Sequence, residues 1–236
     1  MTQYEDRDAP LRVSVRELTL VIERVLLLTG LLPGLVPAVR ECVLRSQAMR
    51  LGGLARLQRC VATLGRPDPA AVIVRQDDGA ALRIDAGGLH AWVVGPTLLD
   101  LAIARAHRHG GAAVLAEGVA DPGELRVLEA LAPRQGARVA VAADGPAATI
   151  RCTACGLPAL LPDDVLHAAL QDGVMIDGAL WWAMHHLSNQ ALAPDSAQSR
   201  RHAGPIILEP DGSITGRADV DDDTDLTLLA APARPG

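Results

Sequence analysis

The sequence predicts an α/β protein in which a helical N-terminal segment precedes a mixed sheet with helices packed on it. A helix-start signal and three helical apolar patterns occupy residues 11–65. Short β-branched runs then alternate with helical patterns, as in βα units that contain at least some parallel pairing. The 236 residues are 49% hydrophobic, which is enough for one large domain or two small ones.

The helical segment begins at a capping box. Ser14 is the expected N-cap and Glu17 reaches back to it, since a Ser and a Glu three residues apart satisfy each other's backbone donors. Apolar residues follow at helical spacing until Gly30. Two more helices are expected at about 36–49 and 53–64.

The α/β core is expected over residues 66–150. The turn Asp77-Asp78-Gly79 joins two predicted strands, because an Asp-Gly pair between apolar runs is typical of a hairpin. The remaining predicted elements are strands at 71–75, 80–84, 90–94, 112–115 and 137–142, and helices at about 96–108 and 122–132.

The C-terminal part, residues 151–216, is expected to add two helices and a hairpin to the same core. Cys152–Gly156 is interpreted as a turn, followed by helices from about 162 to 172 and from 178 to 193. The hairpin is expected at 205–215. Residues 1–10 are expected to be a disordered lead and 217–236 an acidic tail.

Charge and composition exclude several classes of protein. The net charge is −6 and the 22 basic residues are dispersed, which argues against a nucleic-acid partner. Charged residues, Gly and Pro interrupt the most apolar stretch, Leu20–Val36, so no membrane span is expected. The polar start lacks the features of a signal peptide, and four cysteines are too few for a secreted disulfide framework. These observations favour a cytoplasmic protein.

The segment Leu11–Leu57 resembles the opening of the type-2 malate/L-lactate dehydrogenases, which include ureidoglycolate and sulfolactate dehydrogenases. It ends in Gly53-Leu54-Ala55-Arg56-Leu57, which matches the family pattern Gly, apolar residue, Ala-Arg-Leu. In the family an Asp-Ser-His triplet precedes this Gly, and the His is the catalytic acid/base. Here Arg50, Leu51 and Gly52 stand at those positions.

The resemblance continues to about residue 145 but loses a second motif. Leu99–Ile103 fits a family helix closely, and the strand at 112–115 falls where the family has one. The family then has Asn-His-Phe-Gly beside the nicotinamide ring, whereas this chain has Glu117–Gly123 with no His. The segments Ile176–Trp181 and Ala193–Arg200 resemble the end of a family of bacterial proteins of unknown function.

Candidate site residues are few. Arg50 can bind a carboxylate but cannot release a proton near neutral pH. His186, four residues after Trp182 on one helix face, and His90 are the candidates for a replacement acid/base, although a partly buried amphipathic helix is the favoured explanation for His186. Arg200 either anchors an anion or belongs to a polar turn.

Cys152 and Cys155 form a CxxCG pair that would suit half of a zinc site. His167 follows Cys155 at near zinc-finger spacing, but no second His comes within the next few residues, so zinc is disfavoured. A redox dithiol and two ordinary structural cysteines remain the alternatives.

Two missing catalytic motifs favour a dehydrogenase-derived protein that has lost hydride transfer and acts as a binding or accessory subunit. The alternative is an NAD(P)-dependent oxidoreductase acting on a small 2-hydroxy or 2-keto acid with relocated catalytic groups. An unrelated reaction in the old cleft is a third hypothesis. The resemblance implies NAD(P) as the possible cofactor and a homodimer, or a hetero-oligomer with a related subunit, as the assembly.

Overall fold

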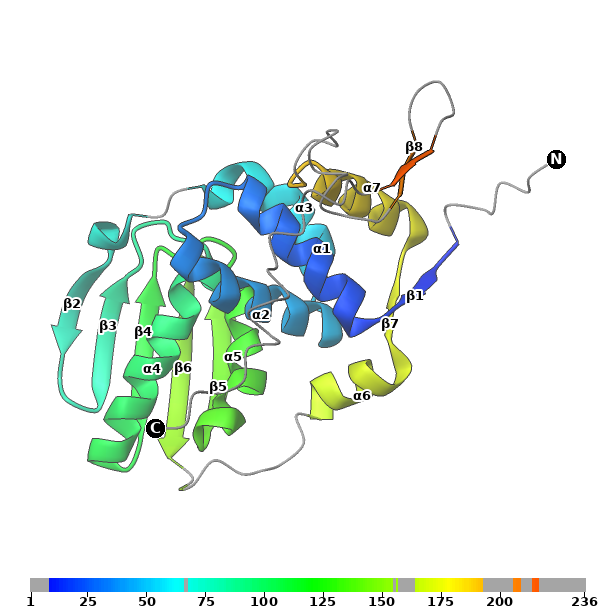
Figure 1. Ribbon diagram of the computed structural model, residues 1–236. Helices are drawn as coiled ribbons and strands as arrows, with labels where there is room; N and C mark the ends of the chain where they lie inside the picture. The colour runs from blue at the N-terminus through cyan, green and yellow to red at the C-terminus, as the bar shows by residue number, and fades with distance from the viewer. Residues whose placement is uncertain are drawn as a thin grey trace, which may run out of the picture. The chain divides into compact units, whose positions relative to one another are not determined.

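The computed structural model describes residues 9–65, 68–154, 156 and 164–192, and the backbone of 206–208 and 214–216. The chain divides into two units, Met1–Leu192 and Ala193–Gly236. In the first unit, helices precede a mixed five-stranded sheet with helices packed on it (Figure 1). The α/β class predicted from the sequence is therefore confirmed.

The first helix starts at the predicted capping box. Ser14 Oγ accepts a hydrogen bond from the Glu17 amide at 3.1 Å, and Glu17 Oε2 accepts one from the Ser14 amide at 3.2 Å. One apolar stripe of this helix is fully buried against α2 and α7. The helical elements of this part are α1 (Val15–Leu28), η1 (Pro33–Leu35), α2 (Val36–Ala48) and α3 (Gly53–Leu64).

The main sheet has the strand order β2-β3-β4-β6-β5. Only the β3–β4 pair is parallel, and helix α4 connects these two strands. The other three pairs are antiparallel, and two of them are formed by strands adjacent in the sequence. The strands are β2 (Ile73–Asp77), β3 (Ala81–Asp85), β4 (Ala112–Glu117), β5 (Ala137–Asp144) and β6 (Ala147–Ala154).

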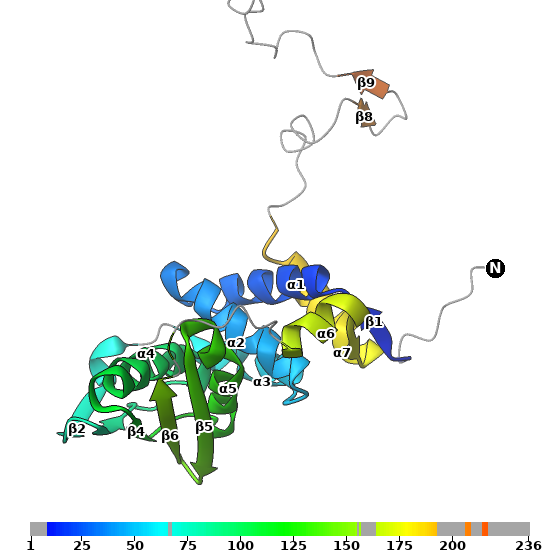
Figure 2. The same ribbon diagram turned by 90° about the horizontal axis from the view of Figure 1, so that it is seen from below.

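Helices α4 and α5 contact the sheet and each other, and α2 packs against both of them (Figures 1 and 2). Strand residues that face the helices alternate with exposed ones, as Leu82 and Ile84 do in β3. Exposed ion pairs, such as Arg83 with Glu117, lie on the strands between these buried positions. The helical elements between residues 69 and 135 are η2 (Pro69–Ala71), α4 (Ala91–His109), η3 (Pro122–Arg126), α5 (Val127–Leu131) and η4 (Ala132–Gln135).

A second, two-stranded sheet joins distant parts of the sequence. β1 (Leu11–Val13) pairs antiparallel with β7 (Val174–Ile176), with Leu11 opposite Ile176. β7 lies between α6 (Asp164–Asp172) and α7 (Gly178–Asn189). The C-terminal segment is thereby fixed beside the helical start, and α7 contacts both α1 and α3 (Figure 2).

Three sequence predictions were wrong. The strand expected at 90–94 is the first turn of α4, because the His90 side chain caps a helix there. The turn expected at Cys152 lies inside strand β6. The helix expected at 122–132 is a 3-10 segment followed by only five α-helical residues.

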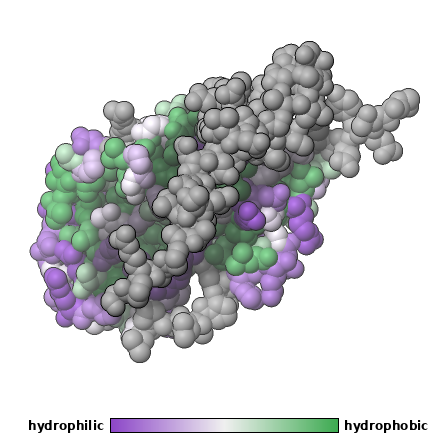
Figure 3. All heavy atoms as spheres, in the orientation of Figure 1, coloured by the Kyte–Doolittle hydropathy of each residue, from purple (hydrophilic) through white to green (hydrophobic). Residues whose placement is uncertain are grey.

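The second unit contains the antiparallel pair β8 (Ile206–Leu208) and β9 (Ile214–Gly216), at the residues where two paired strands are expected. Most of the expected N-terminal lead and the whole acidic tail, 217–236, lie outside the described residues. Among the helices that the structure describes, none is long and apolar enough to cross a membrane. On the face shown in Figure 3, hydrophobic and hydrophilic side chains are interleaved over the described residues.

Candidate functional site

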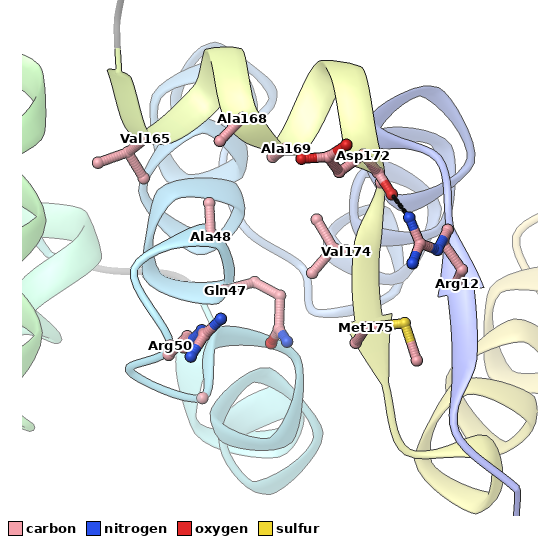
Figure 4. A pocket seen from close by; sticks show the side chains of 12 residues that line it. Arg12, Gln47, Ala48, Arg50, Val165, Ala168, Ala169, Asp172, Val174 and Met175 are labelled. Atoms are coloured by element: carbon pink, nitrogen blue, oxygen red, sulfur yellow. Dashed lines mark hydrogen bonds between the residues drawn. The ribbon is translucent and has the colours of Figure 1, made fainter.

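The candidate site is a cavity of about 520 Å³ between the α2–α3 turn and the α6–β7 segment (Figure 4). This volume is within the range of small-molecule pockets. Its charged lining residues are Arg12, Arg50 and Asp172, and Gln47 adds an amide. The remaining side chains of its wall are apolar, from Ala48, Val165, Ala168, Ala169, Val174 and Met175.

The α2–α3 turn presents Arg50 to the cavity. The Arg50 amide donates to Gln47 O at 3.1 Å, and the Leu51 amide donates to Ser46 O at 2.8 Å. This pair of bonds is a Schellman motif, which places Arg50 in the left-handed position that glycine usually occupies. Arg50 has φ of 60°, one of two non-glycine residues with positive φ in the described chain. An arginine there is strained, and such strain is concentrated at functional sites.

Gln47 and two glycines fix the start of α3. Gln47 Oε1 accepts a hydrogen bond from the Leu54 amide at 2.9 Å, which supplies the cap that Gly52 lacks. Gly52 has φ of 88° and lines the cavity. A Cβ on Gly53 would lie 2.4 Å from Val43 O, so glycine is required where α3 crosses α2.

The opposite wall is built around the end of α6. Arg12, on β1, donates from Nη1 to the backbone oxygen of Asp172 at 2.8 Å, at the C-terminal end of α6 (Figure 4). A cation is favourable there because unpaired carbonyl groups give a helix end partial negative charge. Gly173 then turns the chain into β7 with φ of 71°. Arg12 and Arg50 therefore reach the cavity from separate elements.

The charged groups of the lining have a net charge of +1, from two arginines and one aspartate. The whole chain has a net charge of −6. The cavity is thus a local positive region on an acidic protein, which favours an anionic ligand.

Arg56, in the segment Gly53–Leu57, lies in a separate cluster. Its Nη1 donates to Asp121 Oδ1 at 2.6 Å, and its Nε lies 2.7 Å from Glu124 Oε1. The single hydrogen of Nε is donated to Leu51 O at 3.1 Å, so the contact with Glu124 Oε1 is an ion pair and not a hydrogen bond. Arg56 therefore links α3 to the α2–α3 turn and to the segment that follows β4.

Glu124 is the buried member of this cluster, with 1% of its surface exposed. Burial raises the pKa of its carboxyl group, while the nearby Ser46 hydroxyl and a hydrogen bond from Trp92 oppose that rise. Trp92 Nε1 donates to Glu124 Oε2 at 2.9 Å. A buried carboxylate with these partners links the segment after β4 to α3 and α4.

His90 caps helix α4. Its Nδ1 accepts from the Trp92 amide at 3.2 Å, so the ring proton lies on Nε2. Nε2 is 3.8 Å from Asp121 Oδ2, too long for a hydrogen bond. Burial lowers the pKa of His90 to about 4. His90 also borders a second cavity, of about 180 Å³, which Gly87 and Gly88 help to line.

His186 lies elsewhere, on the exposed side of α7. Its ring centroid is 6.3 Å from that of Trp182, as expected for residues four apart on one face. The large cavity is lined by other elements. The structure therefore places His90, His186 and Arg50 at three separate locations.

The cysteine pair is only half described. Cys152 lies buried in β6, and Cys155 is outside the described residues, as is Arg200. Burial raises the pKa of Cys42 to about 12 and that of Cys60 to about 11, so both are thiols near neutral pH. In the part of the chain that the structure covers, no three His, Cys, Asp or Glu side chains are grouped to hold a metal ion.

Sequence reasoning missed the three other polar or charged side chains of the cavity: Arg12, Gln47 and Asp172. Arg12 and Asp172 are 160 positions apart and meet only through the β1–β7 pair. Strands of three residues give too little alternation to be recognised. Gln47 lies in the last turn of α2, seven residues before Leu54, and nothing in its spacing indicates a cap for the following helix.

No protein-family model matches this chain, and no curated protein matches it. Solved structures that resemble it include malate dehydrogenase from Entamoeba histolytica, at 16% identity over 56% of this chain and 38% of that one, with a TM-score of 0.45. Malate dehydrogenase from Pyrococcus horikoshii OT3 gives 20% identity over 56% and 40%, with a TM-score of 0.46.

A third similar structure is delta1-piperideine-2-carboxylate reductase from Pseudomonas syringae pvar. tomato, at 17% identity over 77% of this chain and 70% of that one, with a TM-score of 0.42. The chain spans about two fifths of the length of the two malate dehydrogenases, at 38% and 40%.

Proposed function

We propose that this chain is a dehydrogenase-derived protein that has lost hydride-transfer chemistry and acts as a binding or accessory subunit. The observation that carries the proposal is the use of Arg56. This residue of the retained motif is paired with Asp121 and Glu124, and it works as a structural clamp. The ion pairs of Arg56 would thus favour the sequence Gly53–Leu57 even in a protein that catalyses no reaction.

The chemistry of the large cavity supports the same proposal. Reduction of a carbonyl group by hydride needs a proton donor within hydrogen-bond reach of the carbonyl oxygen. Gly52, at the position of the family histidine, has no side chain to supply one. Arg12 and Arg50 keep their protons near neutral pH. Binding an anion is what these two groups do well.

The accessory role requires a partner, and we place the contact on α1. Four leucines of α1 and the residues after it are more than a third exposed: Leu20, Leu27, Leu28 and Leu32. Grouped exposed leucines favour association, because their burial removes apolar surface from water. A second copy of this chain, or a related subunit, would cover them.

The test is a calorimetric titration of NADH and NADPH against the full chain, followed by an absorbance assay at 340 nm with pyruvate, 2-oxobutanoate and oxaloacetate. The expected result is no oxidation of either nucleotide above the rate without protein. Sustained oxidation that depends on the keto acid would overturn the proposal.

A second candidate is an NAD(P)-dependent oxidoreductase in which His90 replaces the missing acid/base. The observation that favours it is the position of His90 between the smaller cavity and Asp121. A neutral imidazole near pH 7 can accept a proton. The same 340 nm assay distinguishes this candidate from the first. If His90 is the acid/base, the native protein oxidises NADH or NADPH and a His90→Asn variant does not.

A further inference from the structure

We propose that the cavity between the α2–α3 turn and α6–β7 binds a small monocarboxylate with an aliphatic body. Arg50 binds the carboxylate, and the apolar wall from α6 and β7 contacts the aliphatic part. This assignment deepens the proposed binding function, since it names the class of ligand and the residues that select it.

Arg50 is the anchor because of its backbone. Glycine at this position would adopt φ of 60° without strain, so the arginine is retained against a conformational cost. Its side chain extends to the cavity (Figure 4), and no hydrogen bond or ion pair links it to another residue in the described ranges. A guanidinium fork of this kind matches a carboxylate in two-pronged geometry.

Gln47 completes the polar end. Its Oε1 is occupied by the Leu54 amide, which fixes the orientation of the side-chain amide. The NH2 group of that amide then remains as a donor, on the side of Gln47 that is turned toward Met175 in Figure 4. One ligand oxygen can therefore receive a neutral donor in addition to the guanidinium.

The charge count selects a monoanion. The lining carries a net charge of +1, and a single carboxylate neutralises it. A second carboxylate would leave an excess negative charge near Asp172.

The remaining wall is suited to an aliphatic group. Val165, Ala169 and Val174 line it, and Met175 is 55% exposed. An exposed, adaptable methionine beside valines provides apolar contact surface without a polar group to satisfy. Inorganic phosphate would leave this surface unused, which separates a carboxylate ligand from a simple oxyanion.

The experiment uses the full chain and three probes: 4-methylpentanoate, its neutral isostere 4-methylpentanamide, and inorganic phosphate. Binding is measured by ligand-observed NMR and calorimetry at pH 7 and constant ionic strength. The expected order is carboxylate first, with the amide and phosphate each at least tenfold weaker. Equal binding of acid and amide, or tighter binding of phosphate, overturns the proposal.

Two variants and a control locate the site. Arg50→Gly removes the guanidinium and relaxes the turn, so it should keep the fold and weaken 4-methylpentanoate at least tenfold. Met175→Gln should weaken 4-methylpentanoate severalfold and leave phosphate unchanged. Arg108→Gln, with the same loss of charge on the exposed end of α4, should leave every affinity unchanged.

Unchanged carboxylate binding in Arg50→Gly would exclude this cavity. The two proposals fail separately, because turnover of NADH overturns the non-catalytic role and leaves the binding order and variant effects as they are. Absence of carboxylate binding overturns the ligand assignment alone.

Discussion

Arg56 Nη1 lies 2.6 Å from Asp121 Oδ1, and this ion pair joins α3 to the start of η3. Asp121 has φ of 58°, so it is the second non-glycine residue in a left-handed conformation among those described. The contact connects the segment Gly53–Leu57 with the segment Glu117–Gly123, which lie 60 and more positions apart in the sequence.

Replacement of Arg56 tests this clamp. Arg56→Met leaves the buried carboxylate of Glu124 without its cation, which should lower the free energy of unfolding by about 3 kcal/mol. The measurement is urea denaturation followed by circular dichroism. In the double variant Arg56→Met/Glu124→Gln the cost should be clearly less than the sum of the two single costs. Strict additivity would show that the pair is not coupled.

Arg50→Gly should stabilise the protein. Glycine removes the left-handed strain, which is worth about 1 kcal/mol, although it adds some freedom to the unfolded chain. Thermal unfolding of the native chain and the variant provides the measurement. Arg50→Ala is the matched control, since alanine removes the same charge and keeps most of the strain. A glycine variant less stable than the alanine variant would contradict this account.

Two neighbouring glycines should respond differently to alanine. Gly53→Ala places a methyl group 2.4 Å from Val43 O and 2.8 Å from the Gln47 amide, so α2 and α3 must separate. We expect a loss of about 3 kcal/mol. Gly52→Ala meets nothing within 4 Å and should cost only about 1 kcal/mol, from its φ of 88°. Equal costs in chemical denaturation would argue against tight helix crossing at Gly53.

The lowered pKa of His90 predicts that the folded protein loses stability in acid. This pKa is lowered to about 4 from an ordinary 6.5, so between these values the unfolded chain binds a proton that the native protein does not. The stabilisation is complete above pH 6.5 and is lost as the pH falls towards 4, by about 3 kcal/mol at most. Denaturation at a series of pH values measures it.

The control is His90→Asn, because asparagine keeps an N-cap without a titrating ring. The difference in stability between this variant and the native chain should change across the same pH window. A constant difference would mean that His90 titrates normally in the folded protein.

Leu27 tests the proposed association surface. It is 57% exposed, so Leu27→Glu should leave the free energy of unfolding of a protomer nearly unchanged. Burying a charge in an interface is costly, and the variant should dissociate at least tenfold more readily in sedimentation experiments. Val74→Glu on the edge strand β2, at 58% exposure, is the control. A native chain that stays monomeric at all concentrations would contradict the prediction.

Local signals predicted much of the fold. The capping box at Ser14 located α1, and Asp77–Gly79 located the β2–β3 hairpin, because each signal depends on backbone groups within a few residues. The start of α4 was missed because the short apolar run at 90–94 fits either a strand or a helix. Strand β6 was missed because its alternating buried positions include Ala148 and Cys152, which give a weak apolar signal.

The candidate site was predicted only at Arg50. That prediction came from one residue in a turn, whereas the cavity is formed by elements far apart in the sequence. Arg12 and Asp172 become neighbours through long-range strand pairing, which local spacing cannot specify. The structural role of Arg56 was equally hidden, since its partners Asp121 and Glu124 follow a different strand.

The β1–β7 pair also constrains the order of folding. Leu11 pairs with Ile176, so more than 160 residues must be closed into a loop before this sheet can form. Contacts of such high sequence separation form late, after helices and hairpins that depend on near neighbours. During synthesis on the ribosome, the first strand must wait for nearly the whole first unit. The wall that carries Arg12 is therefore assembled last, and a chain interrupted before residue 174 would contain Arg50 without a cavity around it.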